Sequence, residues 1–180
     1  MESSAKCEVY SAESGEWSEV SSMNTSRMAF ALTYFQDKVW AIGGDSNMNL
    51  LDTVETYDLG ENKWKTADVR LLQIRSGHRA VAHDKKIFVI GGTSDMNKET
   101  CSVEVYSSVT NQFTCVAEMN IARSYFGCSV HGNKILVFGG YLNENQISDS
   151  VEVYDIENDV WSKGPSLPLP LASFGYSSKN

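Results

Sequence analysis

Val151-Glu152-Val153-Tyr154 (VEVY) is the last of four related tetrapeptides that decide how this 180-residue chain folds. An aromatic residue, Trp161, follows its tyrosine by seven positions, and the same spacing holds in every copy. The other copies are Cys7-Glu8-Val9-Tyr10 with Trp17, Val54-Glu55-Thr56-Tyr57 with Trp64, and Val103-Glu104-Val105-Tyr106 with Phe113. Their starting positions are almost evenly spaced along the chain. A regular interval of this size predicts a supersecondary unit repeated along the chain.

Three double glycines recur at the same interval: Gly43-Gly44, Gly91-Gly92 and Gly139-Gly140. In the third unit, the apolar run at residues 135–138 (ILVF) ends at the double glycine, which favours a strand buried on both faces. The other strands of this unit are expected at residues 124–131, 151–154 and 160–162. Four antiparallel strands with short turns and one longer loop are typical of a propeller blade.

The repeats therefore predict an all-β fold, a partial β-propeller of four-stranded antiparallel blades with about 3.75 repeats. The expected parts are a half blade at residues 7–19, whole blades at 27–67, 75–116 and 123–163, and the first strand of a further blade at 172–177.

A charged pair recurs with the blades. Glutamates occupy the middle of one predicted strand in each unit, flanked by apolar residues; they are Glu8, Glu55, Glu104 and Glu152. A buried carboxylate needs a partner, because burying it alone is prohibitive. Arginines with the spacing of the double glycines lie near the start of each blade: Arg27, Arg75 and Arg123. We expect each arginine to bond a periodic glutamate; the alternative is that the glutamates point to solvent at a blade edge.

Composition narrows the function classes. The formal charge of −8 repels phosphate backbones and anionic lipid, which disfavours nucleic-acid and membrane roles. No apolar run approaches the ~18 residues that span a bilayer, and the N-terminus has no signal-peptide pattern. The cysteines share no repeat position and form no CxxC pair, which disfavours disulfides and structural zinc. These features favour a reducing, cytoplasmic setting.

The sequence predicts no enzyme, no cofactor and no metal. His83 and His131 lie one repeat apart, in equivalent hairpin turns of successive blades, which is too far apart for one metal ion. His78 is expected to be a packed or rim residue. The double glycines lead from strands into loops, so they cannot form the helix-terminus phosphate site that nucleotide-binding proteins use.

The double glycine, followed by a tyrosine and a tryptophan six residues apart, resembles the Kelch repeat from about Cys7 to Tyr176. The VEVYD-like strand and the methionine-to-arginine stretches at 23–27 and 119–123 most resemble Kelch-like proteins, which carry BTB and BACK domains ahead of the propeller. This resemblance implies a protein–protein interaction module, the substrate-recognition propeller of an adaptor for a cullin-type ubiquitin ligase. The alternatives are an actin-binding, cytoskeletal scaffold and a Kelch-type enzyme.

Propellers of the Kelch-like kind usually have six blades, which would need roughly 290 residues at this period. We expect this chain to be a piece of a longer protein with two uncovered blade faces, which would permit self-association. A four-bladed closure, in which the C-terminal strand joins the N-terminal half blade, is the alternative.

The loops after the double glycines are long, polar and divergent: 45–52 (DSNMNLLD), 93–100 (TSDMNKET) and 141–150 (YLNENQISDS). The resemblance implies that these loops form the partner-binding face, with contact positions two residues past each arginine, at Ala29, Gly77, Tyr125 and Ser173. None of these four residues is an arginine, which disfavours an acidic peptide as the binding partner. We expect Tyr125 to anchor a protein partner, and the residues around it are Asn47, Met48, Asn97, Lys98, Asn143, Glu144 and Asn145. The alternative is that these are ordinary solvated loops.

Overall fold

The structure is a computed structural model that describes residues 3–95, 98–143 and 146–174. Within these ranges the chain forms strands and no α-helix, as the sequence predicts. The described residues accordingly hold no helix of the length and apolarity needed to cross a membrane.

Three four-stranded antiparallel sheets carry the repeats, and in each sheet the strands lie in sequence order apart from the small hairpins. Blade 1 consists of β3 (Ala31–Phe35), β4 (Lys38–Ile42), β7 (Thr53–Asp58) and β8 (Lys63–Arg70). Blade 2 consists of β9 (Arg79–His83), β10 (Lys86–Ile90), β13 (Val103–Ser107) and β14 (Gln112–Val116). Blade 3 consists of β15 (Gly127–His131), β16 (Lys134–Phe138), β17 (Val151–Asp155) and β18 (Val160–Lys163).

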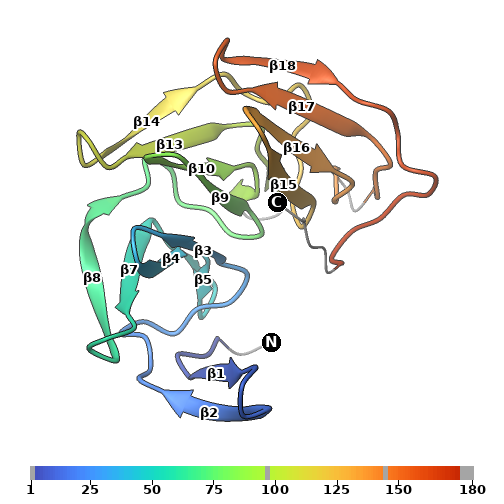
Figure 1. Cartoon of the computed structure of the whole chain (residues 1–180). Helices are drawn as coiled ribbons and strands as arrows, with labels where there is room; N and C mark the ends of the chain where they lie inside the picture. The colour runs from blue at the N-terminus through green and yellow to red at the C-terminus, as the bar shows by residue number, and fades with distance from the viewer. Residues whose placement is uncertain (1–2, 96–97, 144–145, 175–180) are drawn as a thin grey trace.

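Smaller sheets complete the fold. An N-terminal half blade pairs β1 (Cys7–Ser11) with β2 (Glu16–Val20). Two short hairpins, β5 (Asp45–Ser46) with β6 (Asn49–Leu50) and β11 (Thr93–Asp95) with β12 (Lys98–Glu99), form inside two of the long polar loops. Figure 1 shows the sheets along an open arc that runs from β1–β2 through blades 1 and 2 to blade 3. This is the arrangement of a partial propeller.

The first double glycine shows why no side chain fits at this point of the repeat. Gly43 and Gly44 both have left-handed backbone, with φ of 59° and 97°. A Cβ on Gly43 would lie 2.9 Å from the carbonyl oxygen of Arg75 in the next blade, and one on Gly44 would lie 2.7 Å from Cβ of Phe30. The next blade therefore approaches Gly43 too closely for a side chain, and the left-handed conformation itself also favours glycine.

The predicted arginine–glutamate pairing is confirmed in all three blades. Nη2 of the arginine donates to Oε1 of the glutamate over 2.7 Å in blades 1 and 2 and over 3.0 Å in blade 3; the pairs are Arg27–Glu55, Arg75–Glu104 and Arg123–Glu152. All six side chains are buried. In blade 2, Nη1 of Arg75 also donates to the carbonyl of Gly91, and Glu104 accepts hydrogen bonds from the backbone N–H groups of Leu72 and Gln73. Each carboxylate thus ties its blade to the preceding linker.

The prediction that Glu8 is buried and paired is wrong. Glu8 is exposed, because β1 pairs with β2 on one edge and no strand in the described chain pairs with the other edge. The neighbouring ring Trp17 is 68% exposed, whereas its counterpart Trp161 in blade 3 is 8% exposed. The face of β1–β2 is therefore uncovered.

The repeated tryptophans of blades 1 and 3 contact the linkers that lead into their blades. Nε1 of Trp64 donates to the carbonyl of Ser21 over 3.0 Å, and Nε1 of Trp161 donates to the carbonyl of Ala117 over 2.8 Å. Each acceptor belongs to the linker that enters the blade, so the indole fastens its blade to that linker.

The C-terminal segment continues the repeat beside blade 3. Its described part, residues 172–174, is not assigned as strand, and residues 175–177 lie outside the described chain. The backbone N–H of Ser173 donates to the carbonyl of Tyr125 over 2.9 Å, and the ring of Phe174 packs on Phe138 with centroids 5.8 Å apart. No hydrogen bond joins the described part of this segment to β1, so the structure does not support the four-bladed closure.

Candidate partner-binding face

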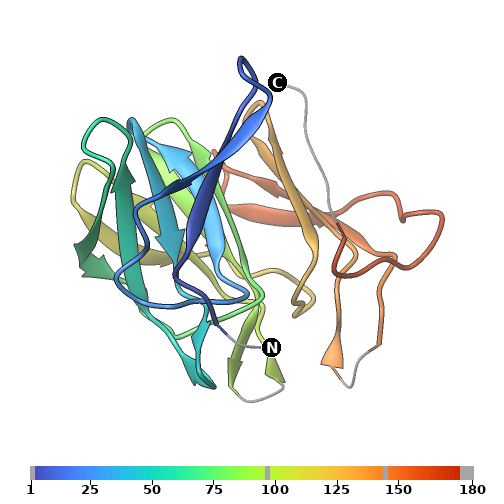
Figure 2. The same cartoon turned by 90° about the horizontal axis from the view of Figure 1, so that it is seen from below.

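The three long loops, one from each complete blade, project from the same side of the arc. Figure 2 shows the β5–β6 hairpin, the β11–β12 hairpin and the loop that follows β16 projecting toward the same side. We call this side of the arc, with Tyr125 at its inner edge, the long-loop face. Because the loops follow equivalent strands, the repeat alone places them together.

A chain of backbone hydrogen bonds runs from blade to blade at the base of this face. It joins the positions two residues past each arginine, or past Leu171 in the last repeat. The N–H of Gly77 donates to the carbonyl of Ala29 over 2.7 Å. The N–H of Tyr125 donates to the carbonyl of Gly77 over 2.8 Å, and the N–H of Ser173 donates to the carbonyl of Tyr125 over 2.9 Å. All four residues have positive φ, between 50° and 62°. Sequence reasoning named these positions but missed the backbone conformation that they share; Gly77 was the available signal.

Tyr125 reaches across the neighbouring blade. Its half-buried ring lies over Gly77, where a Cβ would approach its Cε2 atom to 2.8 Å. The ring of Tyr141 meets it edge to face, with centroids 6.2 Å apart. Burial raises the pKa of Tyr125 above its usual value, and the negative charge of Asp45 in blade 1 adds to this rise. The ring of Tyr125 thus contacts Gly77 of blade 2 and Tyr141 of its own blade, and the charge of Asp45 in blade 1 acts on it.

The other predicted site residues lie at the loop tips. Asn47 and Met48 form the turn between β5 and β6, where Asp45 Oδ1 accepts a hydrogen bond from the Met48 N–H over 2.8 Å. Met48 is 89% exposed. Lys98 and Asn143 are also exposed at this end. In the described chain, no hydrogen bond or ring contact joins these tip residues to Tyr125. The predicted residues Asn97, Glu144 and Asn145 lie outside the described residues.

The site analysis from sequence missed Glu99 and Ser124. Oγ of Ser124 donates to Oε1 of Glu99 over 3.1 Å, which links the β11–β12 hairpin to the residue next to Tyr125. Oε2 of Glu99 is buried and accepts no hydrogen bond from the described chain. The sequence signal was the place of Glu99 in a divergent loop, but nothing in its spacing indicated this contact.

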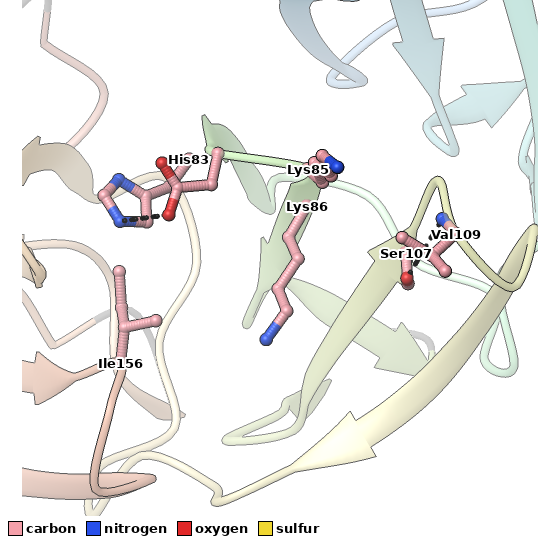
Figure 3. A pocket seen from close by; sticks show the side chains of 7 residues that line it. His83, Lys85, Lys86, Ser107, Val109 and Ile156 are labelled. Atoms are coloured by element: carbon pink, nitrogen blue, oxygen red, sulfur yellow. Dashed lines mark hydrogen bonds and ion pairs between the residues drawn. The ribbon is translucent and has the colours of Figure 1, made fainter.

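A second concave surface lies at the opposite end, between blades 2 and 3. It is a pocket of about 550 Å³ lined by His83, Asp84, Lys85, Lys86, Ser107, Val109 and Ile156. Figure 3 shows His83 and Ile156 on one side of this pocket and Lys86 between them and Ser107. Nε2 of His83 lies 3.6 Å from Oδ2 of Asp84. Nε2 of His83 also lies 3.1 Å from Oδ1 of Asn133. His83 therefore sits at a hairpin turn, as predicted, and the described residues contain no group of three or more histidine, cysteine or acidic side chains that could hold a metal.

His78 is a packing residue, one of the two roles expected for it. It occupies the repeat position that holds Phe30, Phe126 and Phe174 elsewhere, and its side chain is fully buried. Nε2 lies 3.0 Å from the carbonyl of Ile42, while Nδ1 has no partner in the described chain. Burial lowers its pKa to about 3, helped by the positive charge of Arg75. The imidazole is thus neutral at physiological pH.

Comparison with known proteins is consistent with this architecture. Residues 29–172 match the family model described as the KLHDC2/KLHL20/DRC7 Kelch-repeats domain. Kelch-like protein 41b of Danio rerio is 32% identical over 130 residues, which are 70% of this chain and 21% of that protein. Alpha-scruin of Limulus polyphemus is 35% identical over 92 residues, which are 51% of this chain and 10% of that protein. The chain therefore spans only a small part of these curated relatives.

Among solved structures, that of YjhT superposes with a TM-score of 0.80 at 14% identity, covering 96% of this chain and 68% of YjhT. At this identity the likeness establishes the fold alone. The Kelch-like and scruin relatives support, at the level of function class, a protein-interaction module.

Proposed function

The chain belongs to the Kelch-repeat family, and on this basis we propose that it binds a protein partner through the long-loop face. The observation that carries this proposal is the exposure of Met48. Its apolar side chain lies in a turn with left-handed backbone, among polar neighbours, and is 89% exposed. An apolar side chain presented in this way loses water when a partner covers it, which favours binding. Tyr125 provides a half-buried aromatic surface at the inner side of the same face.

The more specific proposal is that this propeller recruits a substrate to a cullin-type ubiquitin ligase, as part of a cytoplasmic Kelch-like adaptor. The identity of 32% to Kelch-like protein 41b over most of this chain supports it. In this role the propeller performs no chemistry of its own, so it needs neither catalytic residues nor a cofactor.

An actin-binding, cytoskeletal scaffold is the second candidate, a role that some Kelch proteins have. The likeness to alpha-scruin is the observation that favours it. Sedimentation of the purified chain with filamentous actin separates the two candidates. If the chain co-sediments with actin and Met48→Ser abolishes this, the result would support the scaffold. If the chain does not co-sediment, the ubiquitin-ligase adaptor is the remaining candidate.

The binding face itself is tested by matched substitutions in the parent protein. Met48→Ser with Asn143→Ala changes two exposed loop tips, and Val109→Ser changes an apolar residue at the opposite end that is 75% exposed. We expect quantitative affinity capture to lose partners with the first variant and to keep them with the second. The same partners captured by all three proteins, with unchanged melting temperatures, would contradict the proposal.

The uncovered face of the half blade β1–β2 provides a further contact surface. Tyr10 and Trp17 on the half blade are 50% and 68% exposed. Their counterparts in blade 3 are buried: Tyr154 packs on Phe88 of blade 2, and Trp161 bonds the incoming linker at Ala117. We propose that a second copy covers this face when the chain is studied alone.

A further inference from the structure

The inner side of the long-loop face brings negative charge to an aromatic ring. The three long loops contain one basic residue, Lys98, against six acidic residues: Asp45, Asp52, Asp95, Glu99, Glu144 and Asp149. Asp45 acts electrostatically on the ring of Tyr125. Glu99 contacts Ser124, the residue before Tyr125. A carboxylate of blade 1 thus acts on the ring of Tyr125, and a carboxylate of blade 2 contacts the residue next to it in the chain.

The carboxylate of Glu99 is incompletely satisfied. Oε1 accepts the hydrogen bond from Ser124, but the buried Oε2 accepts none from the described chain. A buried charged oxygen without a donor is costly, because water is excluded and nothing replaces it. A cation that arrives nearby would therefore gain more from this carboxylate than from an exposed one.

The face of a tyrosine ring also attracts cations, through its negative quadrupole. We propose that the inner side of the long-loop face binds a lysine or arginine side chain of the partner, which packs on Tyr125 between the carboxylates of Asp45 and Glu99. This inference rests on the proposed function and specifies the partner: a protein with an exposed basic segment.

Arg79 must be counted among the charges at this site. Its Nε donates to the carbonyl of Phe126 over 2.7 Å, and its charge acts on Tyr125 in opposition to that of Asp45. This guanidinium therefore opposes Asp45 at the ring, while the three long loops as a whole remain acidic, with one lysine against six acidic residues. The other contact positions, Ala29, Gly77 and Ser173, add no charge.

The test uses two fluorescent decapeptides, one of alternating arginine and glycine and one of alternating glutamate and glycine, titrated into the purified chain and followed by anisotropy. We expect the basic peptide to bind, the acidic one not to bind, and added salt to weaken the complex. Asp45→Asn keeps an acceptor for the Met48 N–H, and Glu99→Gln keeps one for Ser124. Each should weaken binding by about three- to tenfold, typical of a charge pair at an interface.

The control is Glu157→Gln, which removes one exposed charge from the turn between β17 and β18 at the opposite end. It should change affinity by less than about twofold, because a distant exposed charge is screened. A reduction as large as that of Asp45→Asn would mean that the peptide senses only net charge, and the inference would fail.

The ring is tested separately. Tyr125→Phe keeps the aromatic face and should bind almost as the parent does, whereas Tyr125→Leu should lose about two- to fivefold. Equal binding by all three proteins would overturn the role of the ring. Failure of the inference is distinguishable from failure of the proposed function: if the peptide shows no preference but Met48→Ser with Asn143→Ala still loses partners, the face binds a partner of another kind. If neither effect is seen, both proposals fail.

Discussion

Arg75 and Glu104 meet over 2.7 Å, from Nη2 to Oε1, with both side chains buried at the centre of blade 2. Burial lowers the pKa of Arg75 from its usual value, although the negative charge of Glu104 opposes this shift. The pair is neutral as a whole, and backbone N–H donors of the preceding linker complete the carboxylate shell. Removing either partner leaves an uncompensated charge in the sheet.

We therefore expect Arg75→Ala to destabilise the chain by about 3 to 5 kcal/mol, the usual result of breaking a buried pair. Arg70→Ala is the matched control, because its side chain is exposed and bonds Asp52 at the surface. That substitution should cost no more than about 1 kcal/mol. Urea unfolding followed by tryptophan fluorescence measures both, and similar costs would contradict a structural role for the buried pair.

Gly43→Ala tests the close approach between blades. Left-handed backbone alone costs a residue with a Cβ about 1–2 kcal/mol. Gly132 has a similar φ of 54° but no atom within 4 Å of the Cβ position, so Gly132→Ala measures that cost by itself. Gly43→Ala should cost about 1–3 kcal/mol more, because the new methyl group would meet the carbonyl of Arg75. Equal melting temperatures for the two variants would refute the steric explanation.

The pH dependence of the free energy of unfolding should reveal the lowered pKa of His78. Its pKa is about 3 in the folded chain and near 6.5 when unfolded, so between these values the unfolded chain binds the extra proton. Stability is then fully present above pH 6.5 and falls as the pH drops toward 3, with a slope of up to about 1.4 kcal/mol per pH unit.

His78→Phe installs the residue that the other repeats carry and should remove this contribution to the slope. Its control is His131→Phe, which removes an exposed imidazole instead of the buried one. Chemical unfolding at pH 7, 6, 5 and 4 supplies the measurement. A slope that His78→Phe leaves intact would assign the acid sensitivity to other groups.

Solution mass tests the uncovered half blade. Size exclusion with light scattering should give a mass above the monomer value of 19.9 kDa, rising with protein concentration. Trp17→Ser should shift the chain toward the monomer, because it removes the most exposed ring of that face. Val109→Ser removes an exposed side chain elsewhere and should have no effect. A concentration-independent monomer for the parent chain would exclude self-association through β1–β2.

Much of the fold could be predicted from the sequence because the repeats restate the same constraints. Agreement between the glutamate, arginine and double-glycine periods indicated the buried pairs, and the structure confirms the pair in each complete blade. Glu8 shares the sequence pattern but not the environment: a period identifies equivalent residues, while burial depends on which strands surround them. Its exposure could not be predicted from the motif itself.

The candidate site was less predictable. The divergent loops indicated a face and Tyr125 a contact position, yet neither spacing nor composition indicated that Tyr125 lies over Gly77 or that Glu99 contacts Ser124. These contacts join different blades, and they depend on how far the blades rotate relative to one another. Loop residues also follow no period, so one repeat carries no information about the next.

The sequence by itself determined the strand order within a blade, the buried charged pairs and the fact that the long loops share one side of the arc. All of these follow from local patterns that recur at a fixed interval. Only the tertiary structure decided which side chains of the loops come together, which carboxylate oxygen is left without a donor, and which aromatic face stays uncovered. The physical reason is that such properties belong to the packing between blades, where each neighbour sets the solvent exposure and the electrostatic environment of the other.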